Sequence, residues 1–209
     1  MKIISVENLE EAVKEAVLTL KQGGVIVYPT DTMYGLGTNA MLVNSVDRIF
    51  RIKQRPKTKP LPVMIRNMKW AEAVAFVYER EKKILNAIWP GAISVVLPKR
   101  REIPDIVTAD KNNVALRIPK HDFVDKILGR FGYPITGTSA NISGQEPSNK
   151  IGDIIEMFKK QSFQPDLIID AGDLPKSEPS TILDLSSLKP KILRIGLTKP
   201  ETLLKLLEL

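Results

Sequence analysis

Residues 25–37 read VIVYPTDTMYGLG, an apolar run followed by a proline, small polar side chains and two glycines. The β-branched residues at its start indicate a buried strand. Pro29 ends that strand, because proline has no N–H to give to a sheet. A strand that delivers Thr30, Asp31 and Thr32 into a glycine-rich turn is how open α/β sheets build ligand sites. The same residues would also suit an ordinary surface turn, and that alternative stays open at this point.

Outward from this stretch, helical and strand patterns alternate along the chain. We expect helices over residues 9–20, 44–53, 67–78, 79–88, 122–131, 151–158 and 199–207. We expect strands over residues 25–28, 59–65, 93–97, 114–118, 135–138, 167–170, 181–185 and 192–194. The alternation predicts an α/β fold with a twisted, open mixed sheet and flanking helices. Residues 1–209 show no convincing internal boundary and are expected to form one domain.

The composition excludes several classes of protein. Hydrophobic residues make up 43% of the 209 positions, as in a globular chain, and no apolar run reaches the length of a membrane span. There is no cysteine, so disulfides and thiolate metal sites are excluded. The N-terminus lacks a signal-peptide pattern, so we expect a cytoplasmic protein with no membrane partner. The net charge of +7 favours anionic partners such as nucleotides or RNA.

Six cations and no acid lie between residues 48 and 59. The usual explanation of such a run is a solvated helix face. Lys53 and Arg55, however, lie at a predicted helix end that Pro56 breaks, and Lys59 enters the next expected strand. Three cations that converge where two elements meet favour a phosphate clamp.

A second polar loop, TGTSANISG at residues 136–144, follows another expected strand. Its backbone N–H groups and hydroxyls could hold phosphate oxygens, although a capped loop would look the same. Arg117 lies inside a β-branched strand and needs a carboxylate partner, either from the protein or from a ligand. His121 is the only histidine, so we expect it at the surface or in a helix cap and expect no metal site. These features suit a site that works by positioning and charge, as adenylyl transfer can.

Taken together and in order, these separate motifs resemble those of the YrdC-like family. The matching pieces are residues 28–36, 53–56, 59–61, 89–91, 115–119, 138–144 and 179–182. The resemblance implies a twisted, open mixed sheet around a positively charged concave cavity. Longer members of the family append a second domain after a linker. With 209 residues, this chain resembles the single-domain form.

The family makes threonylcarbamoyl-AMP and pyrophosphate from ATP, L-threonine and bicarbonate, so the resemblance implies this nucleotidyltransferase activity, with Mg²⁺ accompanying ATP. A partner threonylcarbamoyl transferase complex would then act on tRNA, and direct contact with tRNA or double-stranded RNA is also implied. Two alternatives stay open: a protein of the same fold with another activity, and a non-catalytic RNA-binding protein. Salt dependence would identify the second, since binding driven by phosphate contacts weakens steeply with salt.

The resemblance also assigns roles to individual residues by motif. Those expected to hold threonine are Thr32, Arg117, Ser139 and Ser180. Those expected to hold ATP are Arg55, Lys59, Asn113, Asn141, Asn149 and Arg194. Lys53 and Arg55 are the expected catalytic residues. Some members carry a histidine where this chain has Met64, which implies a changed threonine contact.

Overall fold

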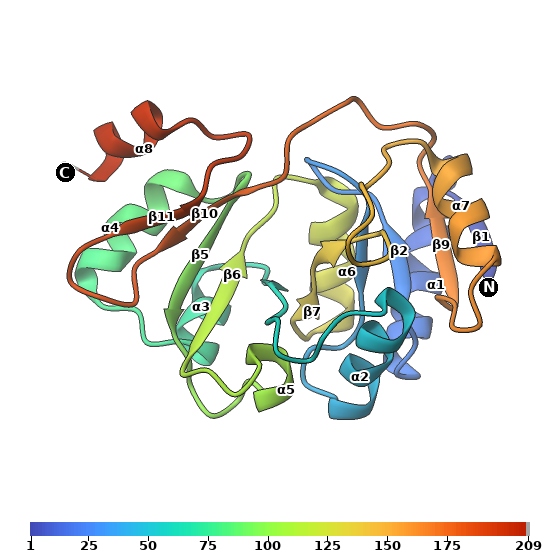
Figure 1. The fold of residues 1–209 in the computed structure, drawn as a ribbon, viewed down its shortest axis with the longest axis horizontal. Coiled ribbons are helices and arrows are strands. Elements are labelled where there is room, and N and C mark those ends of the chain that lie inside the picture. Colours follow the sequence, from blue (N-terminus) through green and yellow to red (C-terminus); the bar gives the residue numbers. More distant parts are fainter. Residues whose placement is uncertain (208–209) are drawn as a thin grey trace.

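The computed structural model describes residues 1–207, and its strands form two mixed sheets with helices packed around them (Figure 1). The predicted α/β class and the mixed strand pairing are confirmed. The strands nevertheless divide between two sheets, where the sequence suggested one. The expected strand at 135–138 is interrupted at Gly137, and its two halves join different sheets. Gly137 lies against Met64 and donates its N–H to the Pro62 carbonyl at 2.8 Å, which takes it out of both ladders.

The five-stranded sheet has the order β1-β9-β2-β3-β8. Its strands are β1 (Lys2–Ser5), β2 (Ile26–Tyr28), β3 (Gly35–Gly37), β8 (Thr138–Ser139) and β9 (Leu167–Asp170). β9 pairs in parallel with both β1 and β2, whereas β3 pairs antiparallel with β2 and β8. β1 and β3 were not expected from the sequence.

The six-stranded sheet has the order β11-β10-β5-β6-β4-β7. Its strands are β4 (Val63–Met64), β5 (Ile93–Pro98), β6 (Asn113–Arg117), β7 (Ile135–Thr136), β10 (Thr181–Asp184) and β11 (Lys191–Arg194). β10 and β5 run parallel, as do β4 and β6. The other three pairs are antiparallel, including that between β10 and β11 near the C-terminal end.

The helices follow the apolar periodicity closely. They are α1 (Leu9–Lys21), α2 (Val43–Lys53), α3 (Met68–Val74), α4 (Glu79–Ile88), α5 (Asp105–Thr108), α6 (Asp122–Phe131), α7 (Ile151–Lys159) and α8 (Pro200–Leu207). Asn67 caps α3 as predicted, accepting from the Trp70 N–H at 3.1 Å. This helix was expected to reach residue 78 but ends at Val74, because Ala75 bridges to Lys99 and Phe76 donates to the Pro98 carbonyl.

The strand that opens residues 25–37 is buried on both faces. Ile26 and Tyr28 pack with α1 and α6 on one face, while Val25 and Val27 join the larger core on the other. Figure 1 shows α1 and α7 beside the five-stranded sheet, α3 and α4 beside the six-stranded sheet, and α6 between them. Within the described residues, no helix combines the length and apolar character needed to span a membrane.

Candidate functional site

A cavity of about 560 Å³ draws its walls from both sheets and from the loops that follow their strands. Seven of the predicted site residues line it: Thr32, Arg55, Lys59, Arg117, Ser139, Ser180 and Arg194. The four that are not part of its lining are Lys53, Asn113, Asn141 and Asn149. Motifs far apart in the sequence therefore meet at one place, as the family resemblance implied.

The turn after β2 is a wall of this cavity and not a surface turn. Thr30 and Thr32 are both buried. The Thr30 hydroxyl accepts from the Thr32 and Met33 N–H groups, each at 3.2 Å, and donates to the Met33 carbonyl at 2.7 Å. β3 then returns against β2, and only glycine fits at Gly37, where a Cβ would lie 2.5 Å from the Thr136 carbonyl oxygen.

Arg117 finds its carboxylate within the protein. Its side chain is 3% exposed, and Nη2 donates to Asp31 Oδ1 at 2.6 Å. Nη1 donates to Thr32 Oγ1 at 3.2 Å, and Nε donates to the Gly91 carbonyl at 2.9 Å. Burial lowers the pKa of Arg117, and the Asp31 carboxylate opposes that shift. The Arg117 guanidinium thus links β6 to the turn after β2 and to the loop before β5.

Lys53 does not join Arg55 and Lys59 as a third member of a phosphate clamp. Its side chain is 1% exposed, and Nζ donates to the Ser139 carbonyl at 2.5 Å and to the Asn141 carbonyl at 2.7 Å. A third bond reaches Asn141 Oδ1 at 3.0 Å. Burial, with a smaller effect from Arg55, lowers the pKa of Lys53 to about 7. Lys53 therefore holds the 139–141 loop from behind the cavity wall.

Asn141 has its whole side-chain amide engaged within that loop. Its Oδ1 also accepts from Ser139 Oγ at 2.6 Å. Its Nδ2 donates to the Ile142 carbonyl at 3.1 Å and to the Gln145 carbonyl at 2.6 Å. In this arrangement Asn141 shapes the loop that presents Ser139 to the cavity.

The cationic run from 48 to 59 divides into two parts. Arg55 lines the cavity and donates from Nε to the Lys59 carbonyl at 3.3 Å and from Nη2 to the Pro60 carbonyl at 2.9 Å. Burial lowers its pKa. Lys57, two residues away, is exposed and forms an ion pair with Asp47 at 2.5 Å. The solvated-face explanation therefore holds for Lys57, and the phosphate clamp stays a prediction for Arg55 and Lys59.

The remaining cluster in the cavity surrounds Ser180, directly before β10. Arg194 donates to the Ser180 carbonyl from Nε at 3.1 Å and from Nη2 at 2.7 Å, and Nη2 also reaches Ser180 Oγ at 3.2 Å. The pKa of Arg194 is lowered by burial and by the positive charge of Arg117. Ser94, on β5, lies 3.0 Å from Ser180 through the two hydroxyl oxygens and also lines the cavity. Sequence reasoning missed Ser94, although strand alternation places it on the same face as Val96, another lining residue.

The other predicted residues lie elsewhere. Asn113 begins β6, at the opposite end of that strand from Arg117. Asn149 donates to the Pro175 carbonyl at 2.7 Å. Neither is part of the cavity lining, so their assignment to ATP stays a prediction.

The expectation that His121 lies at the surface or caps a helix is met only in part, since the residue is half-buried. His121 occupies the N-cap position of α6, but its side chain makes no capping bond there. Its Nδ1 is buried without a hydrogen-bond partner in the described part of the chain. Burial lowers its pKa, and the Asp31 and Asp122 carboxylates oppose the shift.

Residues 1–207 contain no group of three or more His, Cys, Asp or Glu side chains that could hold a metal ion. The lining of the cavity supplies hydroxyls and cations but no carboxylate. Asp31 is engaged by Arg117 and by the Lys120 N–H. Among residues 1–207, the cavity lining thus presents no carboxylate to Mg²⁺, an ion that prefers carboxylate and phosphate oxygens.

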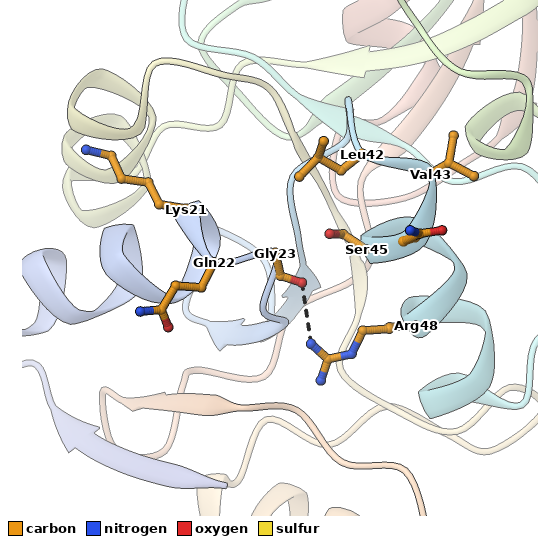
Figure 2. Close-up of a pocket in the computed structure, with 8 residues that line it drawn as sticks. Lys21, Gln22, Gly23, Leu42, Val43, Ser45 and Arg48 are labelled. Carbon is orange, nitrogen blue, oxygen red and sulfur yellow. Dashed lines mark hydrogen bonds between the residues drawn. The ribbon is translucent and has the colours of Figure 1, made fainter.

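A separate hollow of about 510 Å³ lies between the end of α1 and the start of α2. Figure 2 shows Arg48 reaching across it to donate to the Gly23 carbonyl, at 3.4 Å. Arg48 also pairs with Asp166, which offsets its charge. None of the predicted site residues lines this hollow.

Comparisons with known proteins agree with this arrangement. The family model Sua5_yciO_yrdC, described as telomere recombination, matches residues 18–196. The threonylcarbamoyl-AMP synthase of Pyrococcus abyssi is 34% identical over 192 residues, which cover 91% of this chain and 56% of that protein. A putative threonylcarbamoyl-AMP synthase of Methanocaldococcus jannaschii is 33% identical over 201 residues, or 93% of each chain. The crystal structure of P. abyssi Sua5 complexed with L-threonine has a TM-score of 0.91 at 32% identity, covering 99% of this chain and 61% of that one.

Proposed function

The chain belongs to the Sua5/YciO/YrdC family, and we propose that it is an L-threonylcarbamoyladenylate synthase. In this proposal ATP, L-threonine and bicarbonate react to give threonylcarbamoyl-AMP and pyrophosphate. The observation that carries it is one cavity that combines buried hydroxyls, the buried Arg117, which is paired with Asp31, and the cations Arg55 and Lys59. The threonylcarbamoyl-AMP synthase relatives and the threonine complex of P. abyssi Sua5 support this assignment.

The hydroxyl and arginine cluster suits an amino acid. Arg117 supplies a guanidinium for a carboxylate, and guanidinium–carboxylate contacts are among the stronger hydrogen bonds in proteins. Thr32 and Ser180 supply hydroxyls that a threonine side chain can satisfy. Valine has the same shape but would leave the remaining hydrogen-bonding position of each hydroxyl unfilled, so the site is expected to disfavour it.

Arg55 and Lys59 suit the phosphates of ATP. The threonine amine first reacts with bicarbonate to give a carbamate and water, and a carbamate oxygen then attacks the α-phosphorus. The two cations would neutralise the pyrophosphate that leaves. A carbamate breaks down readily in water, so walls that hold the reactants close together favour the second step. We propose that Mg²⁺ enters with ATP and is held by its phosphates, since the described cavity lining contains no carboxylate.

The product would serve a partner threonylcarbamoyl transferase complex that modifies tRNA, and we propose the cytoplasm as the site of action. The net charge of +7 is compatible with direct contact to tRNA or double-stranded RNA. A purely RNA-binding function is the weaker candidate. The exposed cations Arg51 and Lys57 both pair with Asp47, which reduces the positive charge available to a phosphate backbone.

Pyrophosphate release tests the proposal directly. Purified protein is supplied with ATP and Mg²⁺, and L-threonine and bicarbonate are omitted in turn. The proposal requires that either omission abolish the release. Release that ignores threonine would instead favour a family member with another activity, and RNA binding that weakens steeply with salt, without any release, would favour the RNA-binding alternative.

A further inference from the structure

Ser94 is a buried hydroxyl in the cavity that no part of the proposed chemistry yet uses. It lies on β5, where it pairs with Ile182 of the parallel strand β10, and it is 3% exposed. Its Oγ lies 3.0 Å from Ser180 Oγ, and the Ser94 side chain has no other hydrogen-bond partner within the described residues. A buried hydroxyl left without a partner is costly, so this contact must be a formed hydrogen bond.

The polarity of that bond follows from what each oxygen can do. A serine hydroxyl has one proton to donate and two lone pairs that accept. Arg194 Nη2 already donates to Ser180 Oγ at 3.2 Å, which occupies one lone pair because a guanidinium cannot accept. Ser94 therefore takes either the second lone pair of Ser180 or its proton.

In either arrangement Ser180 keeps one hydrogen-bonding position for a substrate hydroxyl. If Ser94 donates to Ser180, both lone pairs of Ser180 are filled and its proton is left for the substrate oxygen. If Ser180 donates to Ser94, its second lone pair is left to accept from the substrate hydroxyl. The bond between the two serines therefore sets which position Ser180 offers and in which direction.

We infer that Ser94 is a positioning residue whose hydrogen bond to Ser180 fixes the orientation of the Ser180 hydroxyl toward the hydroxyl group of the amino-acid substrate. Ser94 then contributes to the choice of threonine over valine through Ser180, without the need to touch either amino acid. This inference rests on the proposed function and adds to it a residue that controls specificity.

A double-mutant cycle on Ser94 and Ser180 tests the inference. The variants are Ser94→Ala, Ser180→Ala and the double change, with Ser94→Thr as the conservative variant that keeps a hydroxyl. The readout is the ratio of kcat/KM for L-threonine to that for L-valine, together with KM for ATP. Ser94→Cys, which keeps the size of the side chain but bonds weakly, replaces Ser94→Ala if thermal melting shows that the alanine variant does not fold.

We expect Ser94→Ala to lower the threonine-to-valine ratio by about tenfold, the effect of losing one buried hydrogen bond, with KM for ATP unchanged. Ser94→Thr should restore most of the ratio. In the Ser180→Ala background, removal of the Ser94 hydroxyl should have little further effect, because the two residues act as a unit.

Two outcomes would overturn the inference. Additive losses would mean that Ser94 contacts the substrate independently of Ser180. An unchanged threonine-to-valine ratio in Ser94→Ala would mean that Ser94 does not act on specificity. If the wild-type protein shows no preference for threonine, the proposed function itself fails, and the inference fails with it.

Discussion

Arg55→Ala should lower kcat/KM for ATP far more than Lys57→Ala, although both changes remove one positive charge. The two side chains are separated by one residue but have different surroundings. Arg55 lines the cavity and is held there by bonds to the Lys59 and Pro60 carbonyls. Lys57 is 65% exposed and is paired with Asp47 at the surface. Lys57→Ala is therefore a matched control for the loss of charge alone.

The size of the effect follows from the hydrogen bonds that Arg55 has left to give. A guanidinium carries five N–H donors, and two of those of Arg55 are used by carbonyls within the described residues. The others can meet phosphate oxygens, and one charge-assisted bond in an enclosed site contributes about 1.5–3 kcal/mol. A loss of that size lowers kcat/KM at least about tenfold. An exposed ion pair such as that of Lys57 contributes well under about 1 kcal/mol.

The assay is pyrophosphate release over a range of ATP concentrations, after circular dichroism has shown that both variants are folded. Arg55→Lys should recover only part of the loss, because an ammonium lacks the planar, forked geometry of a guanidinium. Equal and small losses for Arg55→Ala and Lys57→Ala would show that Arg55 does not bind the phosphates of ATP. In that case the cations from 48 to 59 would be only a basic surface, and the ATP site would lie elsewhere.

Three further predictions concern other parts of the site. Ser180→Ala should raise KM for threonine with KM for ATP little changed, and a fall in ATP affinity would mean that Ser180 belongs to the other ligand. The lowered pKa of Lys53 means that the unfolded chain binds more protons than the folded one between about pH 7 and pH 10.5. The free energy of unfolding of wild-type protein, measured in urea, should therefore rise with pH across that range relative to Lys53→Met, and parallel pH profiles would contradict this. Asp31→Ala should lower the free energy of unfolding by about 3 kcal/mol, the low end for a broken buried pair because Asp31 keeps some exposure, and a loss below about 1 kcal/mol would show that Arg117 does not depend on this carboxylate.

The sequence predicted the long elements well, because apolar periodicity and helix caps are local signals. The helices at 79–88 and 122–131 have the predicted limits. The short strands β1 and β3 were missed. Each has four residues or fewer and is a strand because it pairs with neighbouring strands of the sheet. β1 becomes a strand through its parallel pairing with β9, more than 160 positions away, and nothing in the local sequence of residues 2–5 predicts that pairing.

The candidate site was predicted as a set of motifs, but the direction of each side chain was not. Lys53 and Arg55 look equivalent in sequence, yet one turns inward to the 139–141 loop and the other lines the cavity. The difference arises because α2 ends at Lys53 and Gln54 adopts a left-handed backbone conformation with φ of 50°, which redirects the chain. Ser94 was missed because a single serine in an apolar strand is not distinctive in sequence. Its role depends on the hydrogen bond to Ser180, which lies directly before the neighbouring strand.

The central claim is that three substrates are joined in one cavity. The most direct measurement follows isotopically labelled bicarbonate into an adenylate product in the presence of ATP and L-threonine. We expect label, threonine and AMP to appear in one molecule, formed in equal amount to the pyrophosphate released, and omission of threonine to abolish both. An adenylate that forms without the label, or pyrophosphate release without a threonine-containing product, would contradict that claim.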